Sequence, residues 1–95
     1  MKIKLHENFV RKLTRQVAYI AADKPKAARK FKKDLLSRIK SLIDYPFKYK
    51  KSIFFDSENI RDLTFKGYTV TYKVDSKTSS IEVFGLTKMD LNPEE

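Results

Sequence analysis

The sequence of 95 residues contains no cysteine, a single histidine and only two glycines. Without cysteine it can form no disulfide, thiolate zinc site or thiol nucleophile, and this composition suits a reducing cytoplasm. Two glycines, Gly67 and Gly85, are too few for a phosphate-binding loop, a dinucleotide fingerprint or a nucleophile elbow. These absences exclude most enzyme classes, and we expect no cofactor.

Long apolar runs are also missing. Met1 leads directly into Lys2-Ile3-Lys4-Leu5, which lacks the apolar core of a signal peptide. No later stretch approaches the roughly 20 apolar residues of a membrane span. We therefore expect a cytoplasmic protein without a membrane partner. With 41% hydrophobic residues the chain is apolar enough to fold, and its length suits a single domain over residues 1–95.

The charge of the chain is large and unevenly distributed. The net charge of +9 comes from 21 Lys+Arg and 12 Asp+Glu. Residues 1–51 hold 16 of these cations and 4 of the acids, a net +12, whereas residues 52–95 hold 5 and 8, a net −3. A positive field attracts nucleic acid, an acidic protein or an anionic surface. Charge alone does not choose among these partners, and a solvated, lysine-rich helix face is the simplest alternative.

Helical spacing dominates the first half of the chain. Apolar residues recur three or four positions apart over residues 9–21 and again over residues 28–42. Pro25 is tolerated as the first residue of a helix, and the residue before Pro46 is pushed out of helical geometry. The pattern predicts two helices joined by a tight turn, which is an antiparallel helical hairpin.

Strand-like patterns precede and follow this hairpin. Polar and apolar residues alternate over residues 2–6, which predicts that Ile3 and Leu5 face the core. Residues 52–55 fit either a short strand or the end of a loop. Later strands are predicted at residues 60–65, 68–74 and 80–86, followed by a tail over residues 87–95. We predict an α+β fold: an N-terminal strand, the helical hairpin, then a three- to four-stranded antiparallel sheet packed on the helices.

Histidine and acidic residues offer little chemistry. His6 has no carboxylate or second histidine at ligand spacing, which favours an ordinary residue at a strand end over a base or metal ligand. Asp56 and Glu58 have no second acidic pair that would complete a metal site. We therefore expect no bound metal.

Arg61 breaks the pattern of its strand. It shares a face with Leu63 and Phe65, so alternation places a guanidinium beside apolar side chains. A charge in that position needs a carboxylate, carbonyls or water, because isolated burial is expensive. Arg61 is either pinned by an acid to hold the sheet on the helices, or it presents a phosphate or partner contact at a sheet edge.

Several short motifs occur in the order found in a known family. The first group is Tyr-Ile-Ala-Ala-Asp-Lys-Pro-Lys-Ala-Ala-Arg-Lys-Phe at 19–31, Ile-Lys-Ser-Leu at 39–42 and Pro46. The second is Ile-Arg-Asp-Leu at 60–63, Gly-Tyr-Thr-Val-Thr-Tyr-Lys-Val at 67–74 and Ile-Glu-Val-Phe at 81–84. Together they resemble the helical hairpin, β-hairpin and last strand of the RelE/ParE toxin superfamily. The resemblance implies the toxin of a type II toxin–antitoxin pair, wrapped by an acidic, partly disordered antitoxin.

Two mechanisms compete within that superfamily. RelE-like members cleave messenger RNA on the ribosome, and in this chain Arg61, Lys73 and Lys88 would be the catalytic set. Characterised ParE-like members are not nucleases and poison DNA gyrase. Thr69 and Met89 stand where the nuclease branch commonly has arginine, and the tail has no counterpart of that branch's C-terminal tyrosine. The resemblance therefore favours the ParE-like branch, which is not enzymatic, with the endoribonuclease as the alternative.

A third class of function stays open beside these two. A basic module that binds nucleic acid or protein without toxicity explains the charge but not the resemblance. For a toxin, we interpret the basic first half mainly as the surface that binds the acidic antitoxin. The candidate contacts for antitoxin or target are Val10, Lys30, Lys33, Leu36, Arg61 and Phe84.

Overall fold

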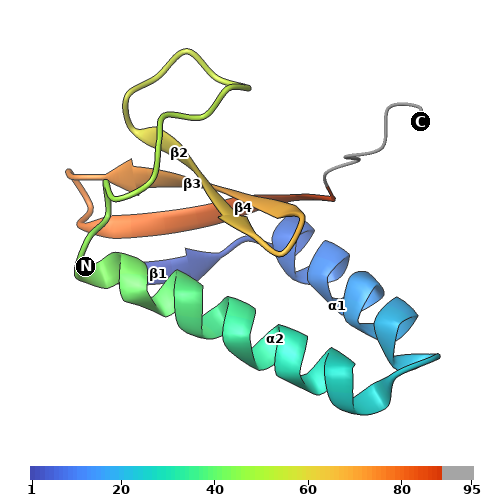
Figure 1. Cartoon of the computed structure of the whole chain (residues 1–95). Coiled ribbons are helices and arrows are strands. Elements are labelled where there is room, and N and C mark those ends of the chain that lie inside the picture. Colours follow the sequence, from blue (N-terminus) through green and yellow to red (C-terminus); the bar gives the residue numbers. More distant parts are fainter. Residues whose placement is uncertain (89–95) are drawn as a thin grey trace.

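The computed structural model describes residues 1–88, in which two helices lie against one face of a four-stranded sheet (Figure 1). The elements in chain order are β1 (Lys2–Leu5), α1 (Glu7–Ala21), α2 (Pro25–Lys40), the short 3₁₀ helix η1 (Ser41–Ile43), β2 (Ile60–Phe65), β3 (Tyr68–Asp75) and β4 (Ser80–Lys88). The predicted α+β fold, its helical hairpin and its strands are confirmed. Met89 lies outside the described residues.

The sheet is mixed, with strand order β1-β4-β3-β2. The strands β2, β3 and β4 are antiparallel as predicted, but β1 runs parallel to β4, from Lys2 opposite Ser80 to Leu5 opposite Val83. The helical hairpin supplies the long crossover that a parallel neighbour requires. Two strands are longer than predicted, since Asp75 extends β3 and Thr87 and Lys88, expected in the tail, extend β4. Residues 52–55, for which a short strand and the end of a loop were both open, lie in a loop.

The core lies between the hairpin and the sheet. Phe9 and Leu13 of α1, and Phe31, Leu35 and Ile39 of α2, are buried against the sheet side chains that alternate toward the helices. Val17 and Ile20, which belong to the apolar spacing of residues 9–21, are partly buried and pack against this core. Burial of these apolar side chains is the main favourable term in folding.

Leu5 is an exception to the predicted core. Its side chain is 40% exposed, whereas Ile3 packs against the core from the same strand. Because β1 lies at the edge of the sheet, with a neighbouring strand on one side only, alternation toward the core does not ensure that each side chain is covered. Within residues 1–88, no helix is long and apolar enough to cross a membrane.

Two local features shape the sheet. The turn between β2 and β3 has Lys66 at φ 46° and Gly67 at φ 81°, the positive values that a tight two-residue hairpin requires. The β3–β4 register shifts after Thr71, which pairs with Gly85, while Tyr72 pairs with Val83. Phe84 is thereby the extra residue of a β-bulge. Its ring lies against His6 and Phe55, at centroid distances of 6.3 and 5.6 Å.

Candidate functional site

A long linker, residues 44–59, joins η1 to β2 and wraps around the outer edge of that strand. Its backbone pairs with β2: Ser52 N donates to Ile60 O at 2.8 Å, and Asp62 N donates to Lys50 O at 3.1 Å. Figure 1 shows the linker rising above the sheet, on the side away from the helices. The linker therefore passes from the helix side of the molecule to the open face of the sheet.

Arg61 connects the middle of this linker to its last residues. Its Nη1 donates to Tyr49 O at 3.0 Å, its Nε donates to Glu58 O at 2.9 Å, and its Nη2 lies 3.6 Å from Glu58 Oε1. The guanidinium also lies over the ring of Phe47, 5.0 Å from its centroid, and the side chain is only 17% exposed. The guanidinium is thus held by an acid, as in the first interpretation, and by two carbonyls, but these contacts fasten the linker to β2 rather than the sheet to the helices. A role of Arg61 in binding a partner stays a prediction.

Asp62 and Tyr72 attach the linker from the two faces of the sheet. On the open face, Asp62 Oδ1 accepts from Thr71 Oγ1 at 3.1 Å and Oδ2 accepts from Ile53 N at 3.2 Å. On the helix side, the Tyr72 hydroxyl donates to Pro46 O at 2.7 Å. Burial raises the pKa of Tyr72 to about 12. These contacts hold the linker in one conformation without regular secondary structure of its own.

A groove of about 770 Å³ lies between the linker and the open sheet face. Its sheet side is formed by polar residues of the three antiparallel strands, which are Asp62, Thr64, Thr69 and Thr87. Its linker side carries the larger side chains Tyr49, Ile53 and Phe54. Four lysines complete the lining, Lys48, Lys50, Lys51 and Lys88. The groove combines apolar and hydroxyl surface with cations.

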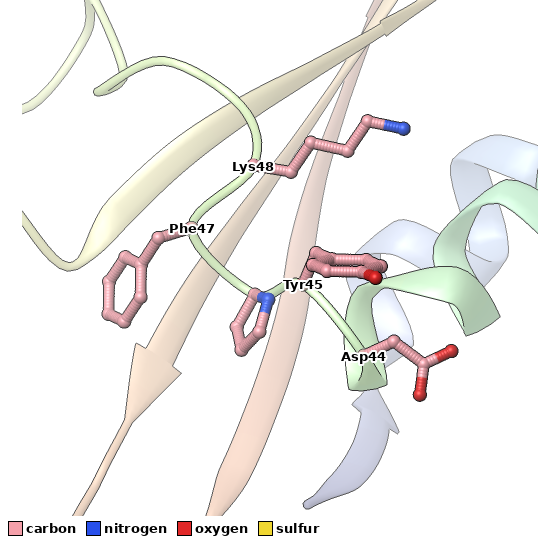
Figure 2. Close-up of a pocket in the computed structure, with 5 residues that line it drawn as sticks. Asp44, Tyr45, Phe47 and Lys48 are labelled. Atoms are coloured by element: carbon pink, nitrogen blue, oxygen red, sulfur yellow. The ribbon is translucent and has the colours of Figure 1, made fainter.

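The same linker exposes large apolar side chains. Tyr45, Phe47, Ile53 and Phe54 are between 47% and 86% exposed. A second, shallower hollow of about 600 Å³ is lined by residues 44–48. Figure 2 shows that Tyr45 and Lys48 extend to one side of the linker there and Phe47 to the other. The exposed rings therefore do not form one continuous surface.

The three residues of the predicted nuclease set do not come together. Lys88 alone among them lines the groove. Arg61 lies on the helix side of the sheet, opposite Tyr72 in register, and its guanidinium is occupied by the linker. Lys73 lies on the open face opposite Glu82, and Lys88 approaches the ring of Tyr19 at 5.8 Å. The set has no common point at which a phosphate could be held.

The predicted partner contacts other than Arg61 are spread over three elements. Val10 on α1 is exposed, while Leu36 on α2 and Phe84 on β4 are partly buried. Lys33 is exposed, and Lys30 forms an ion pair with Asp34 at 3.0 Å. The hydrogen bond from Lys30 holds the pKa of the Asp34 carboxyl below its usual value. These residues mark two regions, the outer surface of the hairpin and the β-bulge.

The linker side chains were missed by the sequence-based list of candidates. Their signal is an alternation of aromatic residues with lysine over 45–51, followed by Ile53, Phe54 and Phe55. That pattern is also typical of a strand, so it did not indicate an exposed surface. Their position in the linker is fixed by tertiary contacts, including those from Arg61, Asp62 and Tyr72.

Comparison with known proteins agrees with this architecture. The family model described as the ParE toxin of the type II toxin–antitoxin system parDE matches residues 3–90. The chain is similar in structure to a protein described as the chromosomal ParDE TA system from P. aeruginosa, with a TM-score of 0.77, 15% sequence identity, and coverage of 95% of this chain and 97% of that one. No curated protein sequence matches. Because the family model spans nearly the whole chain, this protein belongs to the ParE toxin family of type II toxin–antitoxin systems.

Proposed function

We propose that the chain arrests bacterial growth by poisoning DNA gyrase in the cytoplasm, and that an acidic antitoxin neutralises it. The observation that carries this choice of target is the chemistry of the open sheet face, where threonines at 64, 69 and 87 line the groove. The nuclease branch would need arginines and lysines at such positions on the strands, whereas Lys48, Lys50 and Lys51 of this groove come from the linker. The ParE-like branch, whose characterised members poison gyrase, has no such requirement.

Cleavage of RNA by its own 2′-hydroxyl needs cations that stabilise the phosphorane and a group that moves protons. Two candidates for proton transfer, Tyr72 and His6, lie outside the groove. The Tyr72 hydroxyl is bonded to Pro46 O, and its pKa of about 12 keeps it protonated near neutral pH. His6 lies 3.2 Å from Glu82 and does not line the groove. These placements support a non-enzymatic mode of action.

The partner is proposed from the charge of the helical hairpin. Exposed cations line α2, and one of them, Arg38, lies over the core ring of Phe65 at 5.2 Å: Lys26, Arg29, Lys30, Lys32, Lys33, Arg38 and Lys40. Among the described residues, only Lys30 of this group has an ion-pair partner within 4 Å. A strong one-sided field speeds encounter with an acidic protein. Val10 on α1 is exposed and Leu36 on α2 is partly exposed, which supports an antitoxin contact on the hairpin.

Three measurements test the proposal. Expression of the chain alone in bacteria is expected to stop growth, and co-expression of an acidic protein encoded in the adjacent reading frame is expected to restore it. Purified protein is expected to inhibit gyrase supercoiling and to trap cleaved DNA. Unimpaired growth with the folded chain present would count against a toxin. Cleavage of messenger RNA in a purified translation system, without gyrase–DNA adducts, would replace gyrase by the ribosome as the target.

A further inference from the structure

The linker 44–59 exposes apolar side chains even though it is tightly held. Its backbone is bonded to Arg61, Asp62 and Tyr72, and Phe55 packs edge-on against Phe84. Yet Ile53 is 86% and Phe54 is 57% exposed. Exposed apolar groups on a fixed segment contribute nothing to folding, and clusters of them mark interaction sites.

The groove beside these residues has the size and walls of a binding site. Its volume of about 770 Å³ lies within the ~300–1,000 Å³ range of ligand sites, enough for a few side chains. Tyr49, Ile53 and Phe54 supply the apolar wall, and Thr69 is almost fully buried on the opposite side. An occupant therefore has to present apolar side chains to one wall and tolerate hydroxyl groups on the other.

The charges around the groove select an anionic occupant. Lys48 and Lys50 have no carboxylate within 4 Å among residues 1–88, whereas Lys51 pairs with Asp56 at 3.0 Å. Asp62 is the one acid that lines the groove, and both of its oxygens already accept hydrogen bonds. Lysines on the rim of an apolar groove complement carboxylates that flank apolar side chains.

The backbone of the linker argues against an added strand at this place. The outer edge of β2 is already paired at residues 60 and 62 by Ser52 and Lys50. A partner that enters here meets side chains rather than open backbone groups. A helix, whose own backbone is satisfied internally, suits such a groove better than an extended peptide.

Single-stranded nucleic acid fits the same surface less well. Base stacking needs rings with open faces arranged along one track. Among the residues that line the groove, rings come from Tyr49 and Phe54 alone, and Lys48 lies over the ring of Tyr49 at 5.6 Å. Ile53, the most exposed apolar side chain of the linker, offers no ring at all.

We propose that the groove between the linker and the open sheet face binds an acidic amphipathic helix of a partner protein. Apolar residues of that helix contact Tyr49, Ile53 and Phe54, and its carboxylates lie near Lys48 and Lys50. The identity of the partner rests on the proposed function, because a neutralising antitoxin is the acidic protein expected to carry such a helix. The groove itself does not depend on which target the toxin acts upon.

The test is a fluorescence anisotropy titration of the whole chain with three labelled probes. They are an 18-residue Leu/Glu peptide with leucines at helical spacing, the same peptide with lysine in place of glutamate, and the oligonucleotide dT18. We expect the Leu/Glu peptide to bind, the Leu/Lys peptide not to bind, and added salt to weaken the complex. Failure of the Leu/Glu peptide to bind, or tighter binding of dT18 that depends on Phe54, would overturn the proposal.

Matched variants locate the binding site. The double variant Ile53→Ser, Phe54→Ser is expected to weaken binding of the Leu/Glu peptide at least tenfold, and Lys50→Glu several-fold. Ile43→Ser and Lys77→Glu are the controls, since these residues are exposed, do not line the groove and carry the same side-chain chemistry. Thermal unfolding of each variant verifies that it folds. Equal loss in variants and controls would place the peptide elsewhere.

The growth assay separates this inference from the proposed function. A chain that binds the Leu/Glu peptide in the groove but does not arrest growth would refute the toxin proposal and leave the groove assignment standing. If the chain arrests growth, but the double variant Ile53→Ser, Phe54→Ser binds the Leu/Glu peptide as tightly as the wild type, the groove assignment alone would be refuted.

Discussion

The hydroxyl of Tyr72 donates a 2.7 Å hydrogen bond to the carbonyl oxygen of Pro46, 26 positions earlier in the chain. Tyr72 belongs to the central strand β3 and is fully buried, whereas Pro46 lies at the start of the linker. This contact connects the core of the domain directly to the segment that forms the groove. The stability of the fold and the shape of the candidate binding surface are therefore coupled.

Removal of the Tyr72 hydroxyl should lower the free energy of unfolding without leaving a cavity in the core. In Tyr72→Phe the ring is kept and one buried hydrogen bond is lost, which costs about 1 kcal/mol of unfolding free energy. Urea denaturation monitored by circular dichroism measures the change. Tyr45→Phe is the matched control, because the Tyr45 side chain is largely exposed and should give no shift. Equal midpoints for the two variants would contradict a structural role for the hydroxyl.

The raised pKa of Tyr72 predicts a loss of stability in alkali. Burial raises this pKa from 10.0 to about 12, so in the folded protein the phenol stays protonated where the unfolded chain has already ionised. Its contribution is complete below pH 10 and falls as the pH rises from 10 to about 12, since unfolding releases a proton there. Urea midpoints across this range should fall more steeply for the wild type than for Tyr72→Phe. If the urea midpoints of the two proteins fell equally with pH, ionisation of Tyr72 would not contribute to the loss of stability.

Loss of the Arg61 guanidinium should release the linker. Arg61→Ala removes two hydrogen bonds from a charged, mostly buried donor to Tyr49 and Glu58, at an expected cost of about 2–3 kcal/mol. Limited proteolysis should then cut faster within residues 44–59. Arg61→Lys should recover only part of the stability, because one ammonium group cannot match the planar guanidinium, which donates to Glu58 O and Tyr49 O from two different nitrogens. A variant that is fully stable but no longer toxic would instead indicate a contact role for Arg61.

Adjacent leucines of α2 should separate folding from partner binding. Leu35 is fully buried, and Leu35→Ala is expected to cost about 2–5 kcal/mol of unfolding free energy. Leu36 is only partly buried, so Leu36→Ala should cost less than about half of that. If Leu36 contacts the antitoxin, its substitution should weaken the complex despite the small change in stability. Calorimetric unfolding and titration with the antitoxin provide the two values.

Most of the fold followed from local patterns. The two helices and three later strands were predicted because apolar spacing and the prolines at 25 and 46 act over a few residues. The family resemblance of the hairpin and strands rested on such local motifs and is confirmed over residues 3–90. The direction of β1 was not predictable in this way, since a four-residue strand carries no signal for its partner.

The candidate site was less accessible from the sequence. The burial of Arg61 and its need for partners followed from alternation, but the carbonyls of Tyr49 and Glu58 that satisfy it lie in a segment without periodicity. Residues 52–55 fitted either a short strand or the end of a loop, so the exposure of Ile53 and Phe54 was not predicted. Leu5 was assigned to the core because alternation specifies a face of a strand, not whether anything covers that face.

The sequence by itself determined the chemistry available to this protein and where its charge lies. The absence of cysteine, the two glycines and the basic first half are properties of composition, and the helices and strands are properties of short-range spacing. Only the tertiary structure decided that β1 pairs in parallel with β4 and that the linker wraps around β2 to form a lysine-rimmed groove. The physical reason is distance along the chain. These features depend on bonds between residues far apart in sequence, such as Tyr72 to Pro46, which no local pattern encodes.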